Sequence, residues 1–328
     1  MRVGAAVGNF GNFGLEPGVA GCLSVAEEAE RLGYDSVWVH DHVVMPSNVS
    51  SRYLYNASGD SPFRSDQYIY DPLAVMAAIA ARTSRVQIGT SVLIVPYRNP
   101  LVLAKTLATI DQIANGRVVL GIGVGWMAEE FDALGLAELY PHRGRVTDEY
   151  IAACIDLWTQ DGPSSFDGEW VSYRDVGANP RPVQKPHIPI WVGGKSIAAL
   201  RRVARYGAGY HAVGSTPAEL AAEIATVRDA MELAGRDPAQ LTVSMLWGFL
   251  PSGTAEQMID LIGRYAEAGL HHLVAPPPLQ PVPAASGDPH GQLRATLDEL
   301  RRFAADVLPH VQHDAAVEPA GIDLPTDE

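Results

Sequence analysis

The chain is poor in cysteine, in positive charge and in long apolar runs. Its 328 residues include two cysteines, Cys22 and Cys154, which lie in apolar patterns of helical spacing and are expected to pack rather than to form a disulfide. Twenty-four Lys and Arg stand against 38 Asp and Glu, a formal net charge of −14, which argues against nucleic acid or an anionic membrane as a partner. No apolar run approaches the ~20 residues of a membrane span, and Gly8 and Asn9 come too early for a signal peptide. We therefore expect a cytoplasmic protein.

The chain does contain a regular alternation of strand-length apolar runs and helical patterns. The apolar runs lie near residues 2–8, 35–40, 86–95, 117–122, 188–192, 210–213, 241–250 and 271–275. The helix-start signals are Asp71-Pro72, Asn99-Pro100 and the capping boxes Thr216 to Glu219 and Thr254 to Gln257. Eight such units without a second core predict an α/β fold, a (β/α)8 TIM barrel with insertions.

The predicted barrel is a single domain that spans residues 1–310. A helix is expected at residues 147–159 and a small hairpin insertion at residues 165–174. Residues 314–328 carry five acids and no Lys or Arg, so residues 311–328 are predicted to form an acidic, disordered tail. The stretch from Val43 to Tyr70 is long and polar, and a connection of that length is often a lid.

In barrels of this kind the chemistry lies at the C-terminal ends of the strands. The most distinctive of these ends is RVVLGIGVGWMAEEF, residues 117–131, in which Gly121, Gly123 and Gly125 alternate with other residues. Glycines at such spacing let a backbone approach a flat ligand closely. Trp126 stands where a dinucleotide fingerprint needs its third glycine, so a Rossmann site is excluded. A tight turn without a ligand is the alternative interpretation of this segment alone.

Two glycine turns that open helices are candidate phosphate sites. They are Gly193-Gly194-Lys195-Ser196 and Gly214-Ser215-Thr216, on consecutive units. Free backbone N–H groups and the positive end of the helix dipole favour an anion at each. Lys195, Arg201, Arg202 and Arg205 add positive charge, although a solvated helix face is the alternative for the three arginines. Each turn alone could be ordinary, but two in succession indicate a phosphorylated cofactor.

His40-Asp41-His42 ends the second predicted strand, and a strand would place both imidazoles on one face. Metal-dependent hydrolase barrels use such an H-x-H pair, but they need further ligands at later strand ends. His187 precedes the fifth strand, and His271 and His272 begin the eighth, which is the wrong end. We therefore predict no metal site, a structural role for His40, and contact with substrate or cofactor for His42.

Five segments together resemble the luciferase-like monooxygenase superfamily, the flavin barrels related to bacterial luciferase. The segments are VWVHDH, IGTSVLIVPYRNP, GRVVLGIGVGWMAEEF, RGRVTDEY and PIWVGGKS, within residues 1–275. The chain is most similar to the branch that uses the deazaflavin coenzyme F-420. The resemblance implies a luciferase-like barrel, a cis peptide bond at Ser91-Val92 behind the ring, structural roles for Arg143 and Glu149, and His42 near the reactive ring atom.

The strand ends and the resemblance together give one set of candidate site residues. The catalytic candidate is His42. The candidate cofactor-binding residues are Asp41, Thr90, Ser91, Val92, Gly123, Gly125, Trp126, Gly193, Gly194, Lys195, Ser196, Gly214 and Ser215. In deazaflavin-dependent glucose-6-phosphate dehydrogenases a catalytic Glu follows the glycine turn, where this chain has Trp126, so an apolar or planar substrate is expected rather than a sugar phosphate.

The resemblance implies an F-420-dependent oxidoreductase that transfers a hydride between the coenzyme and a small organic substrate. The alternatives are a monooxygenase that uses reduced FMN, a flavin-binding protein without turnover, and a metal-dependent hydrolase. The expected partners are a small-molecule substrate and a second copy of the chain in a homodimer.

Overall fold

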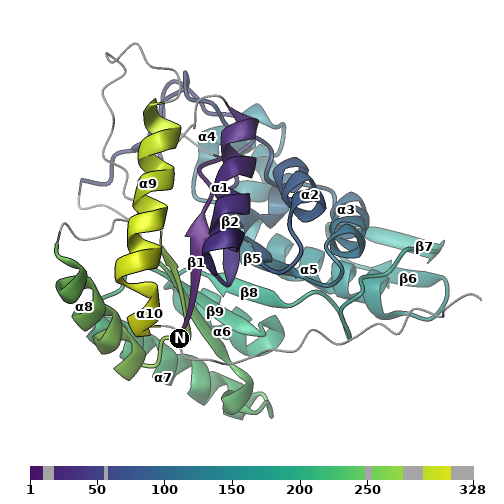
Figure 1. Cartoon of the computed structure of the whole chain (residues 1–328). Helices are drawn as coiled ribbons and strands as arrows, with labels where there is room; N and C mark the ends of the chain where they lie inside the picture. Colours follow the sequence, from purple (N-terminus) through teal and green to yellow (C-terminus); the bar gives the residue numbers. More distant parts are fainter. Residues whose placement is uncertain (10–17, 55–57, 248–252, 276–290, 312–328) are drawn as a thin grey trace, which may run out of the picture.

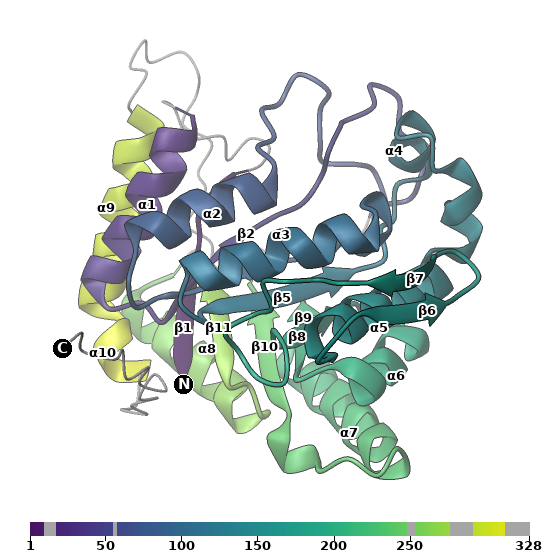
Figure 2. The same cartoon turned by 90° about the vertical axis from the view of Figure 1, so that its right-hand side faces the viewer.

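The computed structural model describes residues 1–9, 18–54, 58–247, 253–275 and 291–311. Eight parallel strands form one closed barrel, because β1 pairs with both β2 and β11 and β3 pairs with β5 (Figures 1 and 2). These strands are β1 (Arg2–Ala6), β2 (Ser36–Val39), β3 (Gln87–Thr90), β5 (Val118–Gly123), β8 (Ile190–Gly193), β9 (Gly209–Val213), β10 (Thr242–Leu246) and β11 (His272–Ala275). The predicted (β/α)8 barrel is confirmed.

Helices cover the outside of the barrel. They are α1 (Val19–Leu32), α2 (Pro72–Arg82), α3 (Pro100–Ile113), α5 (Arg143–Thr159), α6 (Ile197–Tyr206), α7 (Pro217–Leu233), α8 (Ala255–Glu267) and α9 (Gly291–Asp306). The four helix starts expected from the sequence are confirmed, since Asp71 and Asn99 accept from backbone amides and Thr216 and Thr254 each complete a capping box. Helices α1 and α9 lie side by side (Figures 1 and 2), joined by an ion pair between Glu28 and Arg301 at 2.6 Å.

Several shorter elements complete the chain. They are β4 (Leu93–Ile94), α4 (Ala128–Ala133), α10 (Leu308–Val311), the 3-10 turns η2 (Val95–Tyr97), η3 (Ala137–His142) and η4 (Pro238–Gln240), and the hairpin β6 (Ser164–Asp167) and β7 (Ser172–Val176). The hairpin was predicted and is confirmed. Among the described helices, none is long and apolar enough to cross a membrane.

The structure corrects two predicted boundaries. The third strand is not continuous over residues 86–95, because β3 ends at Thr90 and a cis bond at Ser91-Val92 precedes β4. Helix α5 begins at Arg143, four residues before the expected start, because η3 runs directly into it. Buried Val311 ends α10, one residue past the predicted domain limit, and its carbonyl accepts from the Met1 amino group.

Some sequence predictions concern parts of the chain that are not described. The end of the seventh predicted strand, at residues 248–250, three residues of the predicted lid, 55–57, and the predicted tail beyond Val311 lie outside the described residues. Both cysteines are buried and free, as predicted from their apolar surroundings. Burial raises the pKa of the Cys22 thiol to about 11 and that of Cys154 to about 12, so both stay protonated at neutral pH.

The inside of the barrel is filled by aromatic rings rather than by aliphatic side chains alone. Trp38 stacks on Trp191 with ring centroids 5.2 Å apart, and it also stacks on His211 at 5.2 Å. Two glycines make room for these rings, since a Cβ at Gly89 would lie 2.4 Å from Trp38 and one at Gly209 would lie 2.6 Å from Trp191. Wide aromatic side chains therefore face glycine on the neighbouring strand.

Candidate active site

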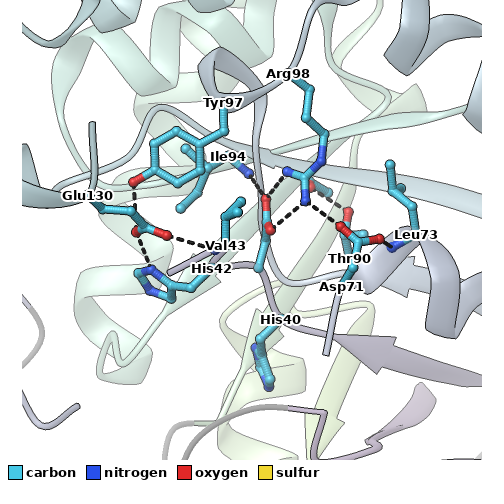
Figure 3. A network of polar contacts seen from close by, with 12 residues as sticks. His40, His42, Val43, Asp71, Leu73, Thr90, Ile94, Tyr97, Arg98 and Glu130 are labelled. Atoms are coloured by element: carbon cyan, nitrogen blue, oxygen red, sulfur yellow. Dashed lines mark hydrogen bonds and ion pairs between the residues drawn. The ribbon is translucent and has the colours of Figure 1, made fainter. Parts of the chain in front are cut away.

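A buried histidine–carboxylate pair lies at the C-terminal end of the barrel (Figure 3). His42 follows β2, and its Nδ1 is 2.5 Å from Oε2 of Glu130 in the first turn of α4. His42 is 7 % exposed and Glu130 is 0 % exposed. The same carboxylate accepts from the Tyr97 hydroxyl at 2.8 Å and from the Val43 amide at 2.7 Å. A carboxylate with these donors holds His42 with its proton on Nδ1 and its ring in one orientation.

Tyr97 is kept in its donor form by the same environment. Burial and the adjacent Glu130 raise the pKa of the Tyr97 hydroxyl far above its ordinary value, so the hydroxyl stays protonated. Tyr97 belongs to η2, the turn that follows the interrupted third strand. Three segments that are distant in the sequence, at His42, Tyr97 and Glu130, thus meet in one hydrogen-bonded group.

Aromatic side chains surround His42 on the side of Trp126. The Phe63 and Trp126 ring centroids lie 5.4 and 6.4 Å from that of His42. Tyr53 packs edge-on against Trp126 at 5.1 Å. Trp126 is partly exposed, so this aromatic wall can present an apolar surface to a ligand. The sequence predicted an aromatic contribution at Trp126. It did not predict the contacts of Tyr53 and Phe63, because the segment from Val43 to Tyr70 has no periodic pattern that indicates where its side chains lie.

The segment between His42 and α2 is attached to the start of α4. Glu129 Oε1 accepts from the Ser50 amide at 2.8 Å and from the Ser51 amide at 3.0 Å. The Ser51 hydroxyl in turn accepts from the Ala128 amide at 2.9 Å. Burial would raise the pKa of Glu129, but the serine donors outweigh it and lower that pKa to about 2. The described part of the predicted lid is therefore held beside the aromatic wall.

The side chain of Asp41 is paired with Arg98 rather than with His42. Its carboxylate is 4 % exposed, forms a bidentate ion pair with Arg98 at 2.6 and 2.9 Å, and accepts a hydrogen bond from the Ile94 amide at 2.8 Å. Arg98 also reaches Asp71, the cap of α2, at 3.0 Å. This ion pair ties the ends of β2 and β4 to α2, so the contribution of Asp41 to a ligand site is restricted to its main chain.

His40 and His42 do not share a face. Strand β2 ends at Val39, and the His40 Nδ1 lies 2.7 Å from the Ser91 carbonyl oxygen while His42 binds Glu130. The expected placement of both rings on one strand face is therefore wrong. Burial lowers the pKa of His40, which keeps its ring neutral near pH 7. Among the described residues, no group of three His, Cys, Asp or Glu side chains is arranged to hold a metal ion.

The glycine turn after β5 is required by close packing with the third strand. A Cβ at Gly121 would lie 1.9 Å from the Thr90 carbonyl oxygen, and one at Gly123 would lie 2.6 Å from the side chain of Val92. Gly125 has φ +82°, which disfavours other residues. Val92, after the predicted cis bond, would also meet a Cβ at Gly193 at 2.9 Å. The barrel thus holds Val92 between two glycines at its C-terminal end.

Thr90 is tied to the same packing. It is 0 % exposed and its hydroxyl donates to the Gly121 carbonyl at 2.6 Å. This bond joins β3 to β5 where the barrel closes. The candidate role of Thr90 in ligand binding is therefore restricted to its main chain.

The two predicted phosphate turns differ in charge. At α6 the cap is the uncharged Ser196, which accepts from the Ala199 amide, and exposed Lys195 precedes it. At α7 the carboxylate of Glu219 accepts from the Thr216 amide at 2.7 Å. A carboxylate already placed on those donors opposes a second anion. Of the two turns, the one at the start of α6, from Gly193 to Ser196, is therefore the better candidate for binding a phosphate group.

Two residues expected near the phosphate have other partners. The Ser215 hydroxyl donates to Glu223, and Ser215 is 1 % exposed, so Gly214-Ser215 could contribute only main-chain groups. Arg202 is buried and paired with Asp148 at 2.5 Å, so its charge is not available to a phosphate at the α6 turn. Lys195, Arg201 and Arg205 remain exposed.

Arg143 and Glu149, which the resemblance marked as structural, both contact the protein main chain. Arg143 donates to the Gly125 carbonyl at 3.0 Å and stacks over the Tyr140 ring at 4.3 Å. Glu149 accepts from the backbone amides of Trp170 and Val171, in the turn of the β6–β7 hairpin. Arg143 thus holds the turn after β5, and Glu149 holds the turn of the hairpin.

Sequence reasoning missed Glu130, Tyr97 and Arg98. The only local signal for Glu130 was a pair of acidic residues at a helix start, which normally indicates a favourable dipole contact. Glu130 is a candidate because it is 0 % exposed and bonded to His42, and the burial of a carboxylate depends on the whole fold.

The chain is a (β/α)8 barrel whose polar groups gather at the C-terminal ends of the strands, the end that carries the active site in barrel enzymes. The chain belongs to the luciferase-like monooxygenase family, whose model matches residues 4–315. The suspected superfamily is therefore confirmed, and members of this family are oxidoreductases and monooxygenases.

Relatives of this chain use different cofactors. It is 31% identical over 263 residues to a protein of unassigned function from Mycobacterium tuberculosis, with 78% of this chain and 85% of that one covered. It is 35% identical over 178 residues to an F-420-dependent glucose-6-phosphate dehydrogenase from Amycolatopsis mediterranei, covering 54% and 48%. It is 28% identical over 213 residues to an FMNH2-dependent dimethylsulfone monooxygenase from Pseudomonas putida, covering 65% and 58%.

The solved structures show the same fold. An F-420-dependent secondary alcohol dehydrogenase, in complex with an F-420–acetone adduct, superposes with a TM-score of 0.73 at 21% identity. The match covers 95% of this chain and 99% of that one.

Proposed function

We propose that this protein is an F-420-dependent oxidoreductase that transfers a hydride between the coenzyme and a small organic substrate with an apolar or planar body. The observation that carries the proposal is the buried pair of His42 and Glu130 beside a partly exposed Trp126. This arrangement offers one group that can exchange a proton, next to a surface suited to a substrate without charge. Hydride transfer to a carbonyl, or from an alcohol, requires such a proton exchange at oxygen.

The roles of the two side chains follow from their hydrogen bonds. Glu130 accepts at Nδ1 of His42, so proton exchange with a substrate takes place at Nε2. Glu130 also stabilises the charge that His42 gains when it takes a proton. Trp126, Tyr53 and Phe63 exclude water on one side and present an apolar face to the substrate.

The residues present fit a flavin-type cofactor. Gly193 and Gly123 leave space that Val92 fills, which gives a smooth apolar surface at the strand ends for a planar ring. The uncharged start of α6, with Gly194, Lys195 and Ser196, would hold the phosphate. When bound, the deazaflavin supplies a carbon centre that accepts or donates a hydride. F-420 continues past its phosphate into a negatively charged tail, which exposed Lys195 at the start of α6 would attract, whereas helix spacing can aim only some of the α6 arginines at the ligand.

A second candidate is a monooxygenase that uses reduced FMN. It is supported by the FMNH2-dependent relative and by the aromatic wall, which could shield a reactive flavin from water. The phosphate turn at α6 would serve either cofactor. The expected homodimer and cytoplasmic location stay predictions.

Titration of the purified protein with F-420 and with FMN distinguishes the oxidoreductase from the monooxygenase. We expect F-420 to bind at least tenfold more tightly than FMN, a difference of ~1.4 kcal/mol or more. The affinity for F-420 should fall with salt, and Lys195→Gln should weaken it more than Arg174→Gln, which removes the same charge from the β7 strand. Tighter binding of reduced FMN, with oxygen consumed in proportion to substrate, would instead establish the monooxygenase.

A further inference from the structure

A continuous chain of hydrogen bonds runs through the inside of the barrel. It begins at Ser36 on β2, passes through His272 on β11, Ser244 on β10 and His211 on β9, and ends at Ser91 after β3. The successive contacts are 2.8, 2.9, 3.0 and 2.8 Å. Four of the five residues are 0 % exposed and Ser91 is 8 % exposed.

The first residue of this chain has a fixed hydrogen-bond direction. The Trp38 Nε1 lies 2.8 Å from the Ser36 hydroxyl oxygen, and an indole N–H can only donate. Ser36 therefore accepts from Trp38. Its own hydrogen is satisfied by the Nε2 of His272, which is the other polar atom in contact with it. A buried hydroxyl hydrogen without an acceptor would cost about 1–3 kcal/mol.

Both histidines must be neutral for this direction to continue. Burial lowers the pKa of His272 and of His211 to about 3. A neutral imidazole has one N–H donor and one acceptor nitrogen. Because His272 accepts at Nε2, it carries its proton on Nδ1 and donates to Ser244.

The same reasoning applies at the next residues. Ser244 accepts from His272, so its hydrogen goes to the Nδ1 of His211. His211 then carries its proton on Nε2 and donates to the Ser91 oxygen. The two histidines are thereby held in opposite tautomers, although both are buried in the same barrel.

We infer that this chain has a single direction, set by Trp38, and that it leaves the Ser91 hydroxyl as a hydrogen-bond donor at the C-terminal end of the barrel. Ser36, Ser244, His211 and His272 are positioning residues, because they act through Ser91. The ligand group that Ser91 recognises is an acceptor nitrogen or oxygen. That this acceptor belongs to the ring of a flavin-type cofactor rests on the proposed function.

Nitrogen-15 NMR of histidine-labelled apo-protein tests the direction without any ligand. Protonated and unprotonated ring nitrogens have well-separated chemical shifts, so each tautomer is read directly. We expect the Nδ1–H form for His272 and the Nε2–H form for His211. Reversed tautomers, or the same tautomer at both, would overturn the inference.

Variants at the two ends of the chain assign the signals. Ser36→Ala should perturb the ring of His272 first, and Ser91→Ala that of His211. If Ser36→Ala does not fold, Ser36→Cys retains a side chain of similar size and serves instead. Trp38→Phe removes the donor that sets the direction and should yield a mixture of tautomers, which a purely structural packing role would not produce.

Cofactor binding tests the role of the last hydroxyl. Ser91→Ala should weaken binding of F-420, or of FMN if that is the cofactor bound, by about 2- to 10-fold, the effect of one neutral hydrogen bond. Ser24→Ala, in α1, is the matched control and should bind as the wild type does. Equal affinity of both variants would overturn the donor role of Ser91. Failure of the wild type to bind either cofactor would count against the proposed function, while the tautomers in apo-protein remain an independent measurement.

Discussion

His42 and Glu130 are 88 positions apart in the chain, yet their side chains share one short contact. If His42 exchanges a proton at Nε2, His42→Ala should slow turnover by ~10²–10⁴ while cofactor affinity stays within a few-fold of wild type. Glu130→Gln retains the size of the side chain but cannot hold a positive His42, so turnover should fall at least ~10-fold.

Steady-state kinetics with the bound cofactor measure both effects, and Glu138→Gln, on the exposed turn η3, is the control. Wild-type turnover in His42→Ala would leave the pair with a structural role only. If His42→Ala loses cofactor affinity by as large a factor as it loses turnover, His42 acts in binding rather than in proton exchange.

At the scale of elements, the closure of the barrel depends on how closely β5 approaches the end of β3. Gly121→Ala would place a Cβ 1.9 Å from the Thr90 carbonyl oxygen, and a main-chain atom cannot rotate away. We expect a loss of ~1–3 kcal/mol in the free energy of unfolding, as for other overpacked sites.

Gly177→Ala is the control for this variant, because a Cβ there meets nothing within 4 Å and the residue has no positive φ. Its effect should stay within ~0.5 kcal/mol. Urea titrations of both variants give the comparison. If Gly121→Ala is as stable as Gly177→Ala, then β5 and the end of β3 can move apart without loss of stability.

At the scale of the whole molecule, the polar interior makes stability depend on pH. The pKa of His211 and that of His272 fall to about 3 in the folded protein, against about 6.5 for an ordinary histidine. Between pH 6.5 and 3 the unfolded chain therefore binds two protons that the folded barrel does not. The stabilisation is fully present above pH 6.5 and is lost as the pH falls through that window.

The expected slope from this pair approaches ~2.7 kcal/mol per pH unit near pH 5, twice the value for one proton. Urea denaturation between pH 6.5 and 5 measures it in a range where most carboxylates remain ionised. His272→Gln should lower the slope by up to ~1.4 kcal/mol per pH unit, the value for one proton, whereas His142→Gln, in exposed η3, should leave it unchanged. If stability changes equally with pH in the wild type, His272→Gln and His142→Gln, the buried ring of His272 does not resist protonation.

Much of the fold was predictable because its signals are local. Asp71-Pro72 and Asn99-Pro100 start helices through contacts with amides two and three residues away, so the sequence around them contains the whole interaction. The apolar runs and glycine turns likewise predicted each βα unit, and eight units in order have few ways to pack. The residues of the family resemblance extended this to the cis bond at Ser91-Val92, which the structure contains.

The site was only partly predictable because its contacts join distant segments. His42, Trp126 and the α6 turn lie at strand ends that the pattern of units already identified. The partners at these strand ends did not follow from any spacing, since His42 is paired with Glu130, 88 positions away, and Asp41 with Arg98, 57 positions away.

By itself, the sequence determined the barrel, its helix starts and the strand ends at which the chemistry lies, because periodicity and capping act over a few residues. Only the tertiary structure decided which polar side chains are buried together. Glu130 meets His42, and His211 and His272 join one chain of hydrogen bonds, because folding removes these side chains from water and leaves each only neighbours from distant segments as partners.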